Sequence, residues 1–532
     1  MPIVTKNKII FGKTDWLSGL AAHQQSTSQN DEYVSAANTS LIRTVSMNPY
    51  RNYDGYASPG FQGSDATNAS AITAALKRIV VHGSNGYASS GNARLHQITA
   101  SSGAIINAGD FPHTVDHAHT NEVLEDVIVY STNISSTRTA RLFYSFNDDT
   151  DADVGTFDFS STFDDNFMST IPSGGAVLTN GIPHPMVVGA DDILYIANGN
   201  VLASLDGATG ANGTFTAAAL TLPVDQQIVS FARIKPRTLV IFTYRSGVSS
   251  NFRGESTAWF WDYISADPYE SIDLNDNRVG AAFEFQGTIG CFTKGRANQA
   301  FTTNSGKLKL WNGSIFETVK IFTDDIPDFG GVDTTEDVIV WNSEGKIYSY
   351  GNVFKFPTAM QYIADGDGTT NGACFHLANN IFGVSSGTST SGGFNLFQSG
   401  YDPTAEAQTI SVRPDFGNKQ FGKITYIKTK FAEINSSTSN VGLDLNIVSD
   451  SNQTTTTVFA DVRGIVVNTT VPSTNQSTMT RVDTKDSSGA EFPEFGDLSL
   501  FLNWVAGGSG TIFAPVIDTV EIGFETKTVK EN

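Results

Sequence analysis

Residues 198–207 read NGNVLASLDG, and similar stretches return as NSGKLKLWNG at 304–313 and as NSEGKIYSYG at 342–351. Each copy has a polar turn that contains glycine, then alternating apolar residues, then a second turn. Alternation with a period of two after a glycine-containing turn is typical of the second strand of a β-hairpin. The repeat therefore indicates how the chain is built, and each copy predicts one hairpin.

Glycine is expected in these turns because it adopts backbone angles that other residues avoid. The glycines that we expect to permit the turn are Gly199, Gly306 and Gly345. The apolar residues that we expect to point into a core after the turn are Val201, Leu308 and Ile347.

Looser copies of the same pattern extend the repeat to seven hairpins. The strand pairs that we predict are 77–83 with 92–98, 125–133 with 139–146, 191–197 with 201–207, 237–244 with 256–263, 297–304 with 307–311, 336–342 with 346–350, and 379–385 with 392–397. The spacing between hairpins leaves room for one further strand on each side. A four-stranded unit of about 40–50 residues, repeated several times, is typical of a β-propeller. A set of stacked sandwiches is the alternative.

Helical patterns are sparse, and the best candidate is AITAALKRIVV at 71–81. Four tryptophans in strand contexts are expected to fill the gaps between blades: Trp259, Trp261, Trp311 and Trp341. The prediction is an all-β fold with a propeller of about seven blades, because stacked blades bury the sheet faces that one blade alone would expose.

The pattern changes at both ends of the chain, which predicts three parts. Residues 1–65 form an N-terminal arm with little regular pattern, residues 66–403 form the propeller, and residues 404–532 form a C-terminal antiparallel β-sandwich. The arm needs a surface for its aromatic residues, either the propeller or a neighbouring subunit. The polar segment 467–492 is expected to be a surface loop of the sandwich.

The net charge and the composition exclude some classes of function and location. The 532-residue chain has a formal net charge of −21, which disfavours specific binding to a nucleic-acid backbone but suits a wall past which DNA slides. The N-terminus lacks a long apolar segment and no stretch is long enough to span a membrane, so we expect cytoplasmic synthesis and no membrane insertion. Cys291 and Cys374 are expected to be buried free thiols.

Two polar clusters could bind a metal. Asp149, Asp151 and Asp153 have the alternate spacing of a calcium loop, although Val154 and Ser160 replace the glycine and glutamate of that motif. The segment FPHTVDHAHT at 111–120 carries His113, Asp116, His117 and His119, which are possible transition-metal ligands. An acidic surface loop and an exposed loop between blades are the respective alternatives.

No motif for phosphate, dinucleotide or nucleophilic chemistry is present, and no carboxylate pair can be nominated for glycoside hydrolysis. Trp259 and Trp261 alternate in TAWFWDY (257–263) and could form a platform for a sugar ring, although filling a blade interface is the alternative. We therefore expect a protein that is not an enzyme and needs no cofactor. A glycan-binding or glycan-hydrolysing propeller is the alternative function, and an exported adhesion propeller is a second.

In layout the chain resembles the tail-associated β-propeller structural proteins of tailed bacteriophages, of the nozzle or tail-tip type. The resemblance rests on DGYASPGF (54–61), on the blade turns of the NGNVLASLDG type, and on SVRPDFGNKQFGKITYIKTKF (411–431). It implies a non-enzymatic virion component that is synthesised in the host cytoplasm and assembled into the tail. The implied partners are other tail proteins, further copies of the same chain, and a host-surface glycan or receptor.

Overall fold

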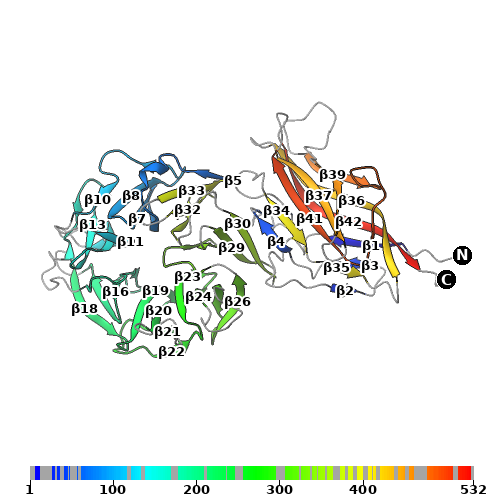
Figure 1. The fold of residues 1–532 in the computed structure, drawn as a ribbon. Coiled ribbons are helices and arrows are strands. Elements are labelled where there is room, and N and C mark those ends of the chain that lie inside the picture. The colour runs from blue at the N-terminus through cyan, green and yellow to red at the C-terminus, as the bar shows by residue number, and fades with distance from the viewer. Residues whose placement is uncertain are drawn as a thin grey trace. The chain divides into compact units, whose positions relative to one another are not determined.

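The repeated hairpins belong to seven sheets of the computed structural model, which together form a β-propeller (Figure 1). The structure describes residues 6–11, 27–29, 33–35, 41–45, 47, 57, 62–116, 122–132, 138–168, 178–208, 213–234, 236–245, 256–294, 306–322, 325–335, 338–343, 346–353, 356–363, 372–377, 381–387, 392–398, 405–409, 411–414, 420–436, 441–449, 454–460, 476–506 and 513–528. By contacts between Cα atoms, the chain separates into two compact units. One unit comprises Ser64–Ile347 and Ala364–Leu396, and the other comprises Met1–Gly63, Tyr348–Ile363 and Phe397–Asn532.

Three blades come from the first part of the propeller. The first holds β6 (Leu76–His82), β7 (Asn85–Ser90), β8 (Arg94–Thr99) and β10 (His113–Thr114), with β9 (Ile105–Ile106) also paired to β8 and a 3-10 turn (Ala69–Ala71) before β6. The second holds β11 (Val123–Thr132), β12 (Thr139–Asn147), β13 (Ala152–Phe157) and β14 (Phe163–Asp164). The third holds β15 (Met186–Val188), β16 (Leu194–Asn198), β17 (Val201–Asp206) and β18 (Thr214–Thr221).

Four more sheets follow the same strand order. The fourth blade holds β19 (Gln226–Ile234), β20 (Thr238–Arg245), β21 (Ser256–Trp261) and β22 (Glu270–Asp273). The fifth holds β23 (Arg278–Phe285), β24 (Thr288–Lys294), β25 (Gly306–Trp311) and β26 (Phe316–Phe322). The sixth holds β27 (Val332–Thr334), β28 (Val338–Ser343), β29 (Lys346–Val353) and β30 (Phe356–Ile363). The seventh holds β31 (Cys374–Leu377), β32 (Ile381–Gly387), β33 (Gly392–Gln398) and β5 (Gln62–Asp65).

The last blade is completed by a strand that precedes the first blade in sequence. The strand β5 pairs with β33, and the amide of Ala66 donates to the carbonyl of Phe394 (2.9 Å). The seventh blade also bonds to the first, because the amide of Ala373 donates to the carbonyl of Leu76 (2.7 Å). The ring is thus held shut by contacts between residues about 300 positions apart in the sequence, which no local pattern specifies.

The predicted propeller of about seven blades is confirmed, and several of its details change. Residues 71–81 do not form a helix. The β-branched residues at the end of this segment belong to the strand β6. The segments 77–83 and 92–98 do not pair with each other, because the strand β7 (NGYASS) lies between them and pairs with both. Its residues are mostly small and polar, so it lacks the apolar alternation by which the other strands were predicted. The strand β25 pairs with β24, while 297–304 lies outside the described residues.

Of the two predicted turn glycines that the structure describes, one behaves as predicted. Gly199 has φ +67° in the turn between β16 and β17. Gly306 is the first residue of β25, where an added Cβ would lie 2.2 Å from the Phe322 ring, so close packing and not a turn requires glycine there. Gly345 lies outside the described residues. Leu308 and Ile347 are buried as expected, whereas Val201 is only half-buried.

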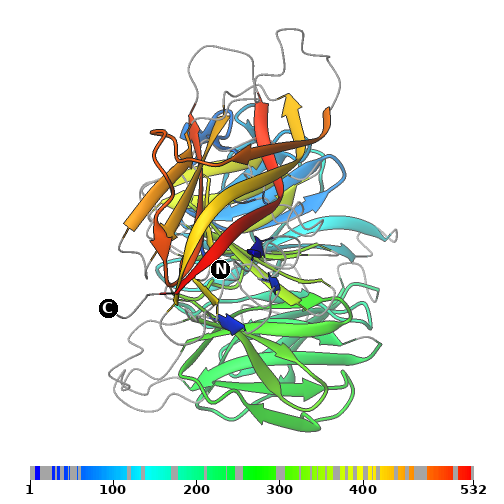
Figure 2. The ribbon, with the colours of Figure 1, turned by 90° about the vertical axis from the view of Figure 1, so that its right-hand side faces the viewer.

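The second unit contains a two-layer sandwich. One sheet has the order β3 (Tyr33–Ser35), β1 (Lys6–Phe11), β42 (Phe513–Thr528), β36 (Gln420–Ser436), β39 (Gln476–Asp483), with β40 (Glu494–Phe495) on β36. The other has the order β2 (Thr27–Gln29), β35 (Val412–Pro414), β41 (Leu498–Ala506), β34 (Glu406–Thr409), β4 (Leu41–Val45), with β37 (Val441–Ser449) on β41 and β38 (Thr454–Phe459) on β37. Figure 2 shows β36 and β42, in yellow and red, side by side.

The N-terminal strands belong to this sandwich. The strand β1 pairs antiparallel with β42, β4 pairs antiparallel with β34, and β2 pairs parallel with β35. The strands β1, β2 and β4 of the arm thus pair with the C-terminal domain, a third possibility beside the two expected, while β5 at the end of the arm pairs with the propeller strand β33. Residues 467–492, expected to be a loop, contain the strand β39. The boundaries at 65/66 and 403/404 stay predictions.

Candidate functional site

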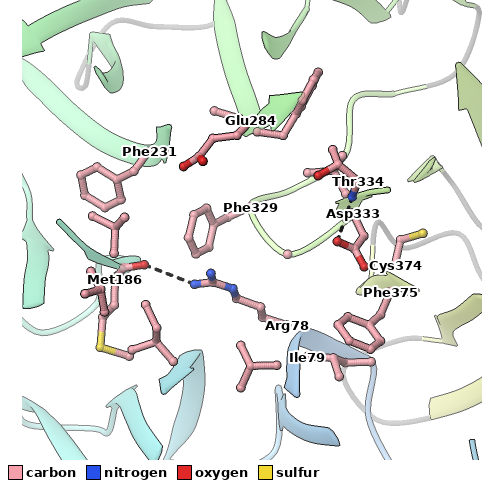
Figure 3. Close-up of a pocket in the computed structure, with 18 of the residues that line it drawn as sticks. Arg78, Ile79, Met186, Phe231, Glu284, Phe329, Asp333, Thr334, Cys374 and Phe375 are labelled. Atoms are coloured by element: carbon pink, nitrogen blue, oxygen red, sulfur yellow. Dashed lines mark hydrogen bonds between the residues drawn. The ribbon is translucent and has the colours of Figure 1, made fainter. Parts of the chain in front are cut away.

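The first strand of every blade lines one cavity on the axis of the propeller. Its walls come from β6, β11, β15, β19, β23, β27 and β31, and its volume is about 470 Å³. Figure 3 shows the side chains that reach into it. Pockets of about 300–1,000 Å³ accommodate small ligands, so this cavity is the candidate site of the molecule.

A loop between the fifth and sixth blades (326–331) lines the axial cavity and is hydrogen-bonded to three blades. The carbonyl of Pro327 accepts from Ala281 (2.9 Å), that of Gly331 accepts from Asn342 (2.9 Å), and that of Gly330 accepts from Cys374 (3.2 Å). A Cβ on Gly330 would lie 1.9 Å from the carbonyl oxygen of Lys77. Only glycine allows this loop to approach β6 so closely.

The loop places Phe329 in the middle of the cavity (Figure 3). The guanidinium carbon of Arg78 lies 4.6 Å from the centroid of the Phe329 ring, within the range of a cation–π interaction. The ring is half-buried and packs against the apolar cluster of the third and fourth blades. Phe329 is therefore a fixed apolar surface inside an otherwise mixed cavity.

Arg78 is anchored through a single nitrogen. Its Nη1 donates to both carboxylate oxygens of Asp126 (2.9 Å each) and to the carbonyl of Met186 (3.2 Å). Asp126 is fully buried and also accepts from the amides of Val127 (2.7 Å) and Met186 (2.6 Å). Burial raises the pKa of Asp126 to about 6, against the lowering effect of Arg78. Within the described part of the chain, Nη2 and Nε of Arg78 have no hydrogen-bond acceptor.

Two further carboxylates face the cavity. Glu284 accepts from Nε of Arg233 through Oε1 (2.7 Å), and Arg233 also donates to the carbonyl of Val188 (3.0 Å). In Figure 3 the carboxylate of Glu284 points into the open space between Phe231 and Phe329, and no described protein donor reaches its Oε2.

Asp333 is the other carboxylate, and it accepts backbone hydrogen bonds at both oxygens. Its Oδ1 accepts from the amide of Thr334 (2.8 Å) and its Oδ2 from that of His376 (2.7 Å). Burial raises the pKa of Asp333 to about 6. Each carboxylate oxygen of Asp333 thus already accepts a backbone hydrogen bond. We therefore assign Asp333 to the wall of the cavity and not to ligand binding.

The predicted calcium loop lies elsewhere, at the turn between β12 and β13. Asp149 is exposed, whereas Asp153 is buried in β13 and accepts from the amide of Val154 (2.6 Å). Asp148 organises the turn by accepting from the amides of Thr150 and Asp151 (2.7 Å each). Among the residues that the structure describes, no group of three or more His, Cys, Asp or Glu side chains is placed to hold an ion. The calcium site at Asp149, Asp151 and Asp153 stays a prediction.

The histidine segment is partly described. His113 in β10 faces Asp165 (Nε2 to Oδ1, 3.1 Å) and stacks on Phe163 with ring centroids 3.7 Å apart. The amide of Asp116 donates to Oδ2 of Asp165 (3.0 Å), and the Tyr144 hydroxyl donates to Oδ1. His117 and His119 lie outside the described residues. The described contacts join the first blade to the second.

The tryptophans fill blade interfaces. Trp261 and Trp341 are almost fully buried, and Trp341 lies 5.0 Å from Phe292 between ring centroids. Trp259 and Trp261 pack in the same apolar cluster, as their alternation predicts, which favours the interface over a sugar platform. Cys291 and Cys374 are buried free thiols, as expected, and Cys374 lines the axial cavity.

Sequence reasoning did not find Arg78, Glu284 or Phe329. They come from two strands and a loop spread over some 250 positions, and no motif joins them. For Arg78 and Glu284, the sequence signal was a charged residue inside the first strand of a blade, where most residues are apolar. Phe329 had no such signal. Only ring closure brings these residues to one cavity.

No protein-family model matches this chain, and no curated protein sequence is similar to it. Among solved structures, a chain of the crystal structure of the computationally designed Ika8 protein is similar, with 9% identity, coverage of 62% of this chain and 98% of that one, and a TM-score of 0.38. A chain in a crystal structure of the mitotic checkpoint complex is similar with 12% identity, coverage of 64% and 91%, and a TM-score of 0.41. Neither similarity bears on function.

Proposed function

We propose that this chain is a non-enzymatic structural component of a tailed-phage virion and forms part of the tail, as a nozzle or tail-tip subunit. The observation that supports the proposal most is the combination of a seven-bladed propeller with a sandwich built from both chain ends. The resemblance of the sequence implies an N-terminal arm, a propeller and a C-terminal sandwich, and the N-terminal strands of the sandwich are an addition to that layout.

The charges on the propeller axis favour a structural role. Asp126 is paired with Arg78, Glu284 with Arg233, and Asp333 is held by two backbone amides. A general acid and base need carboxyl groups that are placed to reach a substrate and to exchange protons with it. Here most of the carboxylate oxygens are occupied by protein donors, which favours a rigid scaffold.

The net charge of −21 suits a wall beside a DNA channel, because it repels the phosphate backbone. Phe329 and Gly330 line the cavity on the propeller axis, so we place DNA passage in a channel formed by several subunits and not on the axis of one. In the described part of the chain no helix has the length and apolar character needed to span a membrane.

The test is to locate the chain in particles. Tailed particles purified on a density gradient from the source of this sequence are analysed by mass spectrometry and by gold-labelled antibodies in the electron microscope. We expect the chain to co-purify with the particles and the gold to mark the tail, while an abundant cytoplasmic host protein is lost. Recovery of the chain only in the soluble fraction, as a free monomer, would overturn the proposal.

A further inference from the structure

Among the residues that the structure describes, the axial cavity offers a hydrogen-bond donor and a hydrogen-bond acceptor that have no protein partner. Arg78 presents the donors Nε and Nη2, and Glu284 presents the acceptor Oε2. Between them lies the Phe329 ring, held by a loop that is bonded to three blades (Figure 3). A ligand that uses all three must donate, accept and offer an apolar face.

Charge narrows the class of ligand further. The Arg78 guanidinium is already neutralised by Asp126, and the Glu284 carboxylate by Arg233. An anion would compete with Asp126 in a molecule of net charge −21, and a cation would compete with Arg233. A neutral ligand with hydroxyl groups avoids both costs, because each hydroxyl donates and accepts.

We infer that the axial cavity binds a neutral sugar residue, with its hydroxyl groups on Arg78 and Glu284 and its apolar ring face on Phe329. The volume of about 470 Å³ is in the range of small-ligand pockets. The apolar platform is Phe329 on the axis, and not the Trp259 and Trp261 pair that the sequence suggested. The inference rests on the cavity alone, so it can fail while the proposed tail function holds, and the reverse.

The experiment measures binding to the full-length chain by saturation-transfer NMR and calorimetry. The neutral probes are the methyl glycosides of glucose, galactose, mannose and N-acetylglucosamine. Methyl glucuronide is the anionic probe and phenylalanine is the zwitterionic one. We expect at least one neutral glycoside to bind at millimolar concentration and to bind more tightly than the two charged probes.

Two variants assign the site. Phe329→Ala removes the platform and is expected to weaken binding by about tenfold, the contribution of one aromatic contact. Glu284→Gln keeps the shape and an acceptor but not the charge, and is expected to weaken binding several-fold without unfolding. The control Tyr269→Ala removes an exposed aromatic residue outside the cavity lining and should change nothing. Absence of glycoside binding, tighter binding of a charged probe, or binding that both variants leave unchanged would overturn the inference.

Discussion

At the scale of single residues, the axial loop depends on one glycine. The Cβ of an alanine at position 330 would meet two backbone atoms, the Lys77 oxygen at 1.9 Å and the Arg78 Cα at 2.8 Å. Backbone cannot rotate away as a side chain can, so the loop or the first blade must shift. The position of the Phe329 ring in the cavity therefore depends on the absence of a side chain at Gly330.

We expect Gly330→Ala to destabilise the propeller by about 2–4 kcal/mol, because overpacking against backbone is not relieved by rotamer changes. The measurement is the apparent melting temperature from scanning calorimetry. The matched control is Gly91→Ala, whose new Cβ would have only the end of the Lys77 side chain near it, at 3.9 Å. Equal melting temperatures for the two variants would contradict the packing described here.

A second residue predicts how stability depends on pH. His96 in β8 is fully buried, and neither ring nitrogen has a hydrogen-bond partner in the described part of the chain. Burial, and secondarily Arg94, lowers the pKa of His96 from 6.5 to about 4. Because the folded pKa lies below the unfolded one, this stability is fully present above pH 6.5 and is lost as the pH falls toward 4.

We expect His96→Leu to remove this acid sensitivity. Between pH 7 and pH 4 the wild-type chain should lose about 3 kcal/mol of stability relative to the variant, from about 2.5 units of pKa difference. Denaturant titrations of the propeller transition at several pH values measure this difference. His82→Leu is the control, since the His82 ring is only half-buried and stacks on Phe159. A difference that does not vary with pH would contradict the assignment.

At the scale of elements, the interfaces between blades hold the large aromatic side chains. Trp341 in β28 packs between Phe292 of β24 and Phe322 of β26, with ring centroids at 5.0 and 5.6 Å. Neighbouring sheets therefore interlock through side chains that alternate along the strands. This is why a period of two in the sequence was informative for the blades.

We expect Trp341→Ala to destabilise the propeller by about 3–5 kcal/mol, because it leaves a large cavity between the fifth and sixth blades. The apparent melting temperature of the propeller transition is again the readout. Tyr269→Ala is the control, since this side chain is 57% exposed and leaves no enclosed space behind. A loss in Trp341→Ala no larger than in the control would show that the interface is not packed as described.

At the scale of the whole molecule, both chain ends enter the same sandwich, and an early strand completes the last blade. Residues before β5 supply β1 and β4, each bonded to a strand of the C-terminal domain. The chain thus leaves the sandwich, runs once around the ring, and returns. The stability of the sandwich is consequently tied to residues more than 350 positions away from its other strands.

We expect deletion of residues 1–61, which spares β5, to destabilise the sandwich selectively. The buried side chains of Ile9 and Phe11 would be lost, and β42 would become an exposed edge. Calorimetry should show a weakened or missing transition for the sandwich and a retained one for the propeller. Limited proteolysis followed by mass spectrometry should cut first within residues 405–528. Two unchanged transitions would contradict this view of the arm.

The sequence alone determined the all-β class and the number of repeats to within one, and it indicated a sandwich in the C-terminal part although it missed the strand β39, because alternation and turn residues are local signals. It located Trp261 and Trp341 in blade interfaces for the same reason. Tertiary structure alone decided that β5 completes the seventh blade, that the arm joins the sandwich, and that Arg78, Glu284 and Phe329 share one cavity. These are pairings between distant residues, and hydrogen bonds across a sheet or a ring leave no periodic trace in the segments that they join.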